Sequence, residues 1–303
     1  MSLCDIENKA KICRITCGWK KPELPIDWVR LYWRDVHSPA ISRRLGIFDY
    51  RHYQYDNVIE NLLSHIDDIS YSCDINEQLM WTSDVRYKSE QDLSLFDSSP
   101  IDEAKKALLG DIDLIVDKST TYRAVNSNAH TFIDISKTST PQGSYNLPTF
   151  VLFLKKKSKE EEFRNFLNSL SLNLSGHNGV IRLRLSLFDE PDMDKEKKAG
   201  YPIKTHPKEQ QYQASIELVL DKFERGKELF TDINESLAKE HIKEIHTYPV
   251  RAVYTSIYAS KPTIVGLRGY PAYQAIKALN ADNQKNPFLL EWMYGDIAKE
   301  FND

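Results

Sequence analysis

The order of the predicted secondary-structure elements is the feature that most limits the fold, because the same order occurs twice. In each half of the chain, segments with alternating apolar and polar residues are separated by segments with helical spacing. The first half contains strands at 12–19, 50–56, 77–85 and 121–125, and helices at 27–45, 89–96 and 101–109. The second half contains strands at 149–154, 180–188, 211–220 and 247–254, and helices at 160–172 and 222–233.

Each half therefore has the order β-α-β-β-α-β, which is that of a ferredoxin-like split βαβ unit. Two short matches support a duplication. Ser-Leu-Phe-Asp at 94–97 corresponds to Glu-Leu-Phe-Thr at 228–231, and Tyr-Arg-Ala-Val at 122–125 corresponds to Val-Arg-Ala-Val at 250–253. The sequence thus predicts an α+β protein with ferredoxin-like repeats at 8–137 and 149–256, followed by a helical C-terminal extension at 257–303.

Charge and hydropathy exclude several partners. The formal net charge is −4, which gives no general attraction to a polyanion, so no nucleic-acid partner is expected. The sequence has no apolar run of about 18 residues and no start typical of a secretory signal, so we expect no membrane partner and a cytoplasmic location. A small molecule is the partner that remains.

No metal or cofactor site is predicted. Cys13 and Cys17 are four residues apart on one predicted strand, with no further ligands nearby, so free structural thiols are the simpler interpretation. His241 and His246 lack the spacing of a helical zinc site. A chain with only 11 glycines and no glycine-rich loop is a poor candidate for a nucleotide cradle.

Polar and aromatic side chains gather where the first helix leads into the second strand. The run 31–39 contains His37, and Arg43 and Arg44 follow it. The strand 50–55 then carries four aromatic or imidazole side chains, including Tyr50 and His52. A histidine near a carboxylate or a tyrosine can move protons near neutral pH, because its ordinary pKa is close to 6.5. If the chain has an active site, we expect it here.

Two points stay open from the sequence alone. Alternation separates Tyr50 and His52 from Arg51 and Tyr53, but a period of two does not tell which set faces the helices. The acidic stretch 110–113 resembles a pair of carboxylates, yet Gly110 favours a turn into the last strand of the first half.

The first half resembles the EthD family over roughly residues 8–130. The resemblance rests on an aromatic helix with a His-x-Pro motif, then a glycine, a polar aromatic strand and a later strand that contains tryptophan. The matching residues are Tyr32, Trp33, His37, Pro39, Gly46, 50–55 and Trp81. The 89–96 helix, with its Ser-Glu start and Phe96, and the acidic 110–115 stretch also fit.

The resemblance implies a dimeric-type α/β barrel, in which two ferredoxin-like sheets close around a ligand pocket. With two repeats in one chain, the barrel could close within the chain or between chains of a homodimer. The second-half helix at 160–172 has no tryptophan, histidine or proline. The second repeat is therefore expected to be structural, which leaves one active pocket per chain.

The resemblance also implies a cofactor-independent lyase, cyclase or decarboxylase that acts by proton transfer on a small aromatic, quinone-like or polyketide-like compound. The expected catalytic residues are His37, Asp35, His52 and Tyr53. The expected substrate-binding residues are Trp33, Arg34, Arg43, Arg44, Tyr50 and Trp81. The alternative is a non-catalytic binding or accessory protein of the same fold. A heme protein is a further alternative, but the sequence has no clear proximal-ligand motif.

Overall fold

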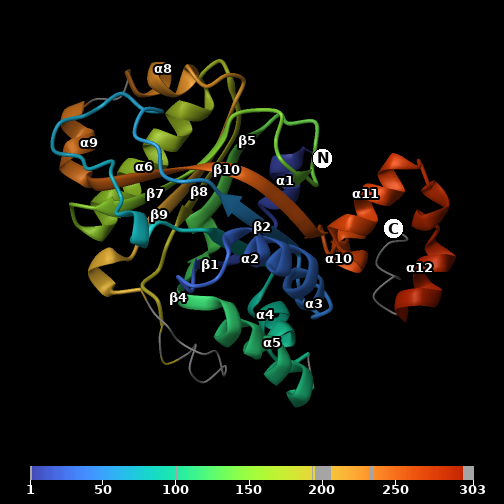
Figure 1. Cartoon of the computed structure of the whole chain (residues 1–303). Helices are drawn as coiled ribbons and strands as arrows, with labels where there is room; N and C mark the ends of the chain where they lie inside the picture. Colours follow the sequence, from blue (N-terminus) through green and yellow to red (C-terminus); the bar gives the residue numbers. More distant parts are fainter. Residues whose placement is uncertain (1, 100, 193, 195–205, 232–234, 296–303) are drawn as a thin grey trace.

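The computed structural model describes residues 2–99, 101–192, 194, 206–231 and 235–295, and all features below belong to these residues. In the first half, strands β1 (Ile12–Lys20), β2 (Asp49–Tyr55), β3 (Trp81–Tyr87) and β4 (Val116–Val125) form an antiparallel sheet in the order β4-β1-β3-β2. Helix α2 (Ile26–Tyr32), a π-helical turn (Trp33–His37) and α3 (Ser38–Ile41) connect β1 to β2. Helices α4 (Glu90–Ser98) and α5 (Asp102–Ile115) connect β3 to β4 (Figure 1).

The second half repeats this topology. Strands β7 (Thr149–Lys156), β8 (Val180–Leu187), β9 (Ala214–Leu220) and β10 (Ile242–Tyr258) lie in the order β10-β7-β9-β8. Helix α6 (Glu160–Ser175) connects β7 to β8, and α8 (Arg225–Thr231) and α9 (Glu235–His241) lie between β9 and β10. Both halves are therefore ferredoxin-like units with the same strand order.

The two sheets join at both edges within one chain. Strand β10 pairs with β7 through its first part and with β2 through its second part. On the other side, β4 pairs with β1, and its continuation after a short turn, β5 (Ala129–Asp134), pairs with β8. The path β4-β1-β3-β2-β10-β7-β9-β8-β5 thus starts and ends on consecutive strands. This is a dimeric-type α/β barrel closed by a single chain.

Further segments lie around the barrel. Helix α1 (Leu3–Glu7) precedes β1 and contacts β5. The short strands β6 (Gln142–Gly143) and β11 (Lys261–Pro262) pair with β10. Helices α10 (Ile264–Arg268), α11 (Tyr270–Ala278) and α12 (Pro287–Tyr294) form the C-terminal extension beside α3 (Figure 1). The extension was expected to reach 303, but 296–303 lie outside the described residues.

Some predicted boundaries were wrong. The stretch 110–113 is helical, because α5 continues to Ile115 despite Gly110, and β4 starts at Val116. A single glycine costs only about 1 kcal/mol in a helix, and contacts elsewhere along α5 outweigh it. The first helical segment ends at Ile41, and β3 begins at Trp81. Strand β10 extends well beyond the predicted 247–254, since its two ends pair with different sheets.

Charged side chains are buried where the two sheets face each other. Glu7 at the end of α1 is 1% exposed, and its carboxylate accepts hydrogen bonds from arginines of both repeats. Arg182 of β8 donates to it at 2.7 and 2.8 Å, and Arg51 of β2 donates at 2.7 Å. Arg86 of β3 lies 3.3 Å from the same carboxylate. Burial alone would raise the pKa of Glu7, but the three arginines outweigh it and hold that pKa well below its ordinary value.

We predict that Glu7→Ala lowers the free energy of unfolding by about 3–5 kcal/mol, because it leaves buried guanidinium groups without their shared carboxylate. Urea denaturation at neutral pH measures the change. The exposed Lys9 lies two residues further along, and Lys9→Ala should change stability by no more than about 0.5 kcal/mol. Equal stability of the Glu7 variant and the wild type would contradict a stabilising role for the ion network.

Candidate functional site

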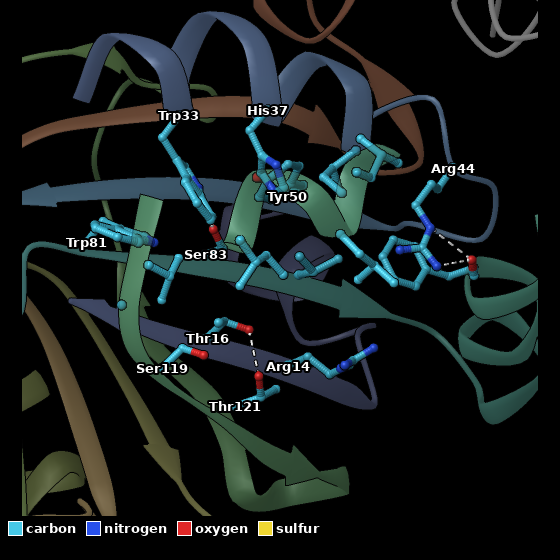
Figure 2. Close-up of a pocket in the computed structure, with 18 of the residues that line it drawn as sticks. Arg14, Thr16, Trp33, His37, Arg44, Tyr50, Trp81, Ser83, Ser119 and Thr121 are labelled. Carbon is cyan, nitrogen blue, oxygen red and sulfur yellow. Dashed lines mark hydrogen bonds between the residues drawn. The ribbon is translucent and has the colours of Figure 1, made fainter. Parts of the chain in front are cut away.

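A cavity of about 120 Å³ lies between the first-repeat sheet and the helices that cover it (Figure 2). Residues of α3 and the preceding π-helical turn line one side, α5 lines another, and β1, β3 and β4 form the floor. Most of the lining is apolar. An engineered cavity of roughly 150 Å³ holds a benzene molecule, so this one suits a ligand of about one ring.

The His-x-Pro motif shapes the wall of this cavity. Pro39 has no N–H and cannot bond the carbonyl of Asp35, which weakens the α-helical pattern at this point. The N–H of Ser38 instead donates to the carbonyl of Trp33, five residues back, as in a π-helix. Trp33 and His37 both point from this turn toward the sheet, and their ring centroids are 4.2 Å apart. The motif thus places an imidazole on an aromatic ring at the cavity wall.

A carboxylate on α5 orients the imidazole. The Nδ1 atom of His37 lies 2.9 Å from Oδ2 of Asp111, and the hydroxyl of Tyr32 donates to Oδ1 of the same carboxylate at 2.6 Å. Burial alone would raise the pKa of Asp111, but the hydrogen bonds from His37 and Tyr32 outweigh it and lower that pKa. The bond to Asp111 raises the pKa of Tyr32 to about 12. Asp111 is therefore ionised at neutral pH and acts as the acceptor for both groups.

This arrangement determines the tautomer of the neutral imidazole. Since Asp111 can only accept, Nδ1 of His37 carries the proton and Nε2 carries the lone pair. His37 is 6% exposed and lines the cavity, and within the described part of the chain Nε2 has no hydrogen-bond partner. The atom is free to accept a proton from a ligand. A proton taken up there would create an imidazolium beside a carboxylate, which stabilises the charge.

Two tryptophans form the aromatic wall. The ring centroids of Trp33 and Trp81 are 4.8 Å apart, and both side chains are buried. Gly18 on the neighbouring strand makes room for Trp81, since a Cβ atom at that position would lie 2.3 Å from the indole ring. The close approach explains why a glycine interrupts β1. The indole Nε1 of Trp81 is a buried donor without a partner among the described residues.

Hydroxyl groups face the cavity from the sheet. Trp33 donates from Nε1 to Ser83 at 3.2 Å, and the hydroxyls of Thr16 and Thr121 lie 3.0 Å apart. The hydroxyl of Tyr50 donates to Ser38 at 3.0 Å. Polar groups at a few points of an apolar wall are the usual means by which a pocket orients a small ligand.

The cavity brings together half of the residues predicted from the sequence. It is lined by Trp33, His37, Arg44, Tyr50 and Trp81. The other predicted residues, which do not line it, are Arg34, Asp35, Arg43, His52 and Tyr53. The sequence left open which face of the second strand points toward the helices. On β2, Tyr50 faces the helices, whereas Tyr53 packs in the core between the two sheets.

Two of the predicted arginines hold the C-terminal extension instead. Arg34 pairs with Asp35 through two bonds of 2.6 and 2.8 Å, and its guanidinium lies 4.6 Å from the ring centroid of Tyr270. Arg43 donates to the carbonyl of Leu267 at 2.6 Å and lies over the ring of Tyr294. These contacts give both arginines a structural role in attaching α10–α12.

His52 lies behind the cavity wall rather than on it. It is 1% exposed, and its ring centroid is 6.4 Å from that of Trp33. Burial first, and then the nearby charges of His37 and Arg34, lower the pKa of His52 to about 3. The ring is thus neutral across the physiological range, which makes it a poor proton donor.

Asp111 is the functional candidate that the sequence interpretation missed. The stretch around it was interpreted as a turn, so its side chain was not connected with His37. Leu108, Ile112 and Ile115 have the apolar spacing of a helix. This spacing could have placed Asp111 on a helix, four residues before the buried Ile115. No motif in the sequence predicts that this helix packs beside the π-helical turn.

Within the described ranges, no group of three or more His, Cys, Asp or Glu side chains is arranged to hold a metal ion. Among the same residues, no helix has the length and apolar character needed to cross a bilayer.

No protein-family model and no curated protein matches the sequence. Solved structures with a similar course of the chain include an anthrone oxidase-like protein with a TM-score of 0.45 and 11% identity, which covers 82% of this chain and 94% of its own. A candidate monooxygenase from Fusobacterium nucleatum has a TM-score of 0.44 and 11% identity, with coverages of 81% and 94%. A mutant chlorite dismutase from Candidatus Nitrospira defluvii has a TM-score of 0.36 and 9% identity, with coverages of 82% and 95%. At these scores no function is taken from the similarity.

The burial of neutral His52 leads to a pH dependence of stability. Its pKa is lower in the folded chain than the ordinary value of about 6.5, so the stabilisation is complete above that value and is lost as the pH falls from 6.5 toward about 3. We predict that His52→Gln flattens the decline in unfolding free energy between pH 7.5 and 5, measured by urea denaturation. The exposed His65 provides the control, since His65→Gln should leave the slope unchanged. The same slope in the His52 variant would contradict the assignment.

Proposed function

We propose that this chain is a cofactor-independent enzyme that moves a proton on a small, one-ring aromatic or quinone-like compound. The observation that carries the proposal is the pair formed by His37 and Asp111 at the wall of an apolar cavity, where Nε2 of His37 has no partner among the described residues. A hydrogen-bonded imidazole with one free nitrogen is the usual form of a protein general base.

In the proposed mechanism, Nε2 of His37 accepts a proton from an acidic C–H or O–H bond of the bound compound. The electron pair of that bond stays on the substrate as an enolate or phenolate. Asp111 stabilises the imidazolium, and Tyr32 holds Asp111 in position. The same nitrogen then returns the proton to another atom of the substrate, so that protons and electrons balance without a further reactant.

The size and walls of the cavity support the choice of substrate. Trp33 and Trp81 offer flat surfaces to a ring, and the hydroxyls of Ser83 and Thr16 offer donors to a developing oxyanion. The cavity volume of about 120 Å³ favours a compound of about one ring over several fused rings.

We also propose that the chain is related to the EthD family. The positions of the matching residues support this: Trp33 and His37 share the cavity wall, and Pro39 lies in α3, directly after the π-helical turn. Gly46 has a positive φ of 80°, and a Cβ there would lie 2.1 Å from the carbonyl oxygen of Asp92. Each motif residue thus has a physical reason to be where it is.

We predict that His37→Gln and Asp111→Asn each lower turnover by about 10²–10⁴-fold, because the first removes the base and the second removes the acceptor that orients it. The measurement is deuterium incorporation from D₂O into a library of one-ring phenols, enones and quinones, followed by mass spectrometry. Asp113 is exposed on the same helix, and Asp113→Asn should retain wild-type turnover.

Turnover that persists in both the His37 and the Asp111 variant would contradict the catalytic proposal. Binding of a ring compound without any conversion by the wild type would favour the alternative, a non-catalytic binding protein. Thermal unfolding of each variant separates a loss of chemistry from a loss of fold.

A further inference from the structure

The indole Nε1 of Trp81 is a hydrogen-bond donor without an acceptor at the cavity wall. Trp81 is 3% exposed and lines the cavity, and its N–H is buried with no partner among the described residues. Figure 2 shows the nitrogen-bearing end of this indole turned toward the other side chains that line the cavity. Burial of a donor without an acceptor is unfavourable. An oxygen atom of a ligand would remove this penalty.

The second tryptophan of the wall differs in this respect. Trp33 donates from Nε1 to the hydroxyl of Ser83 at 3.2 Å, and the hydroxyls of Thr16 and Thr121 lie 3.0 Å apart. Each of these groups has a partner in the protein. No Asp or Glu is among the described residues that line the cavity, so its wall offers no carboxylate to Trp81. The N–H of Trp81 is therefore available to a ligand.

Trp33 separates this donor from the base of the proposed function. Its ring centroid is 4.2 Å from that of His37 and 4.8 Å from that of Trp81, and Figure 2 shows Trp33 between the two. The centroids of His37 and Trp81 therefore lie within about 9 Å of each other. Both side chains can contact one small ring, but at different atoms of it.

This separation matches a carbonyl group next to an acidic C–H bond. A base lies about 3 Å from the carbon that it deprotonates, and a donor nitrogen lies about 3 Å from the oxyanion that it stabilises. The neighbouring carbon and the carbonyl oxygen are about 2.4 Å apart, so the whole path spans roughly 8 Å. A phenol instead presents its proton and its oxygen at one atom, and it cannot engage both groups in this way.

From these observations we infer that the substrate is a one-ring ketone or enone whose carbonyl oxygen accepts a hydrogen bond from Nε1 of Trp81. The inference rests on the proposed function and deepens it, because it names the reacting group and its second protein contact. The C–H bond next to the carbonyl breaks, its proton goes to Nε2 of His37, and its electron pair forms the C=C bond of an enolate. The negative charge moves to the oxygen, where the N–H of Trp81 stabilises it.

The test compares cyclohexanone with methylenecyclohexane, in which a CH₂ group replaces the carbonyl oxygen. The indole N–H signals of the ¹⁵N-labelled protein are followed by ¹H–¹⁵N NMR during titration with each compound. The Trp81 signal is assigned through nuclear Overhauser contacts to Gly18, which adjoins this indole. Cyclohexanone should move the Trp81 proton signal downfield, because a hydrogen bond deshields the proton. Methylenecyclohexane should bind without this shift.

Dissociation constants from the same titrations measure the contribution of the N–H. Trp81→Phe keeps an aromatic ring and removes the donor, so the preference for cyclohexanone over methylenecyclohexane should fall by about tenfold. Trp292→Phe is the matched control, since Trp292 is 83% exposed on α12, and it should leave the preference unchanged. The downfield shift in the wild type tests the inference even if Trp81→Phe does not fold.

Equal responses of the Trp81 signal to the two compounds, an unchanged preference in folded Trp81→Phe, or no binding of either compound would each overturn the inference. The downfield shift should persist in His37→Gln, because it requires binding and no turnover. A loss of proton transfer with the shift retained would contradict the proposed function alone. The two failures are therefore distinguishable.

Discussion

The pairing of one long strand with both halves of the molecule is the constraint on which the structure depends. Strand β10 is the last strand of the second repeat, and it also covers the edge of the first repeat through β2. Strands β4 and β5 make the corresponding connection on the other side. Through these connections, β2 at the edge of the first repeat and β8 at the edge of the second are each paired with a strand of the joining segments. Closure also brings Arg51 and Arg182, from different repeats, to the single carboxylate of Glu7.

Closure in one chain lets the two repeats differ. In the second repeat, α6 packs Phe163, Leu167 and Leu170 into a hydrophobic core that includes residues of β8 and β9. These side chains fill the space between helix and sheet. In the first repeat, the equivalent space holds the cavity, since Gly18 and the small hydroxyl side chains of the floor leave room below the π-helical turn. Helix α6 has no histidine, and its apolar side chains fill the space that holds the cavity in the first repeat.

The sequence predicted the repeated strand order and five residues that line the cavity, but not the pairing across elements. Residue spacing located β1, β2 and the first helical segment, and the His-x-Pro motif pointed to His37. The acidic stretch with Asp111 was weighed as a pair of carboxylates, but Gly110 favoured a turn, and nothing local indicated which helix lies beside the imidazole. The contacts of Arg34 and Arg43 with the C-terminal extension could not be predicted either, because Tyr270 and Leu267 are more than 200 residues away in the sequence. Glu7 was missed for the same reason: a short helix with two acidic residues, Asp5 and Glu7, carries no signal of three distant arginines.

The proton on Nδ1 of His37 is central to the proposed function, because it leaves the lone pair on Nε2, which has no partner among the described residues. Long-range ¹H–¹⁵N NMR of the imidazole side chains at neutral pH measures this tautomer directly, with the His37→Gln spectrum providing the assignment. We predict the Nδ1–H form for His37 in the wild type and its loss in Asp111→Asn. An Nε2–H form in the wild type, unaffected by Asp111→Asn, would contradict it.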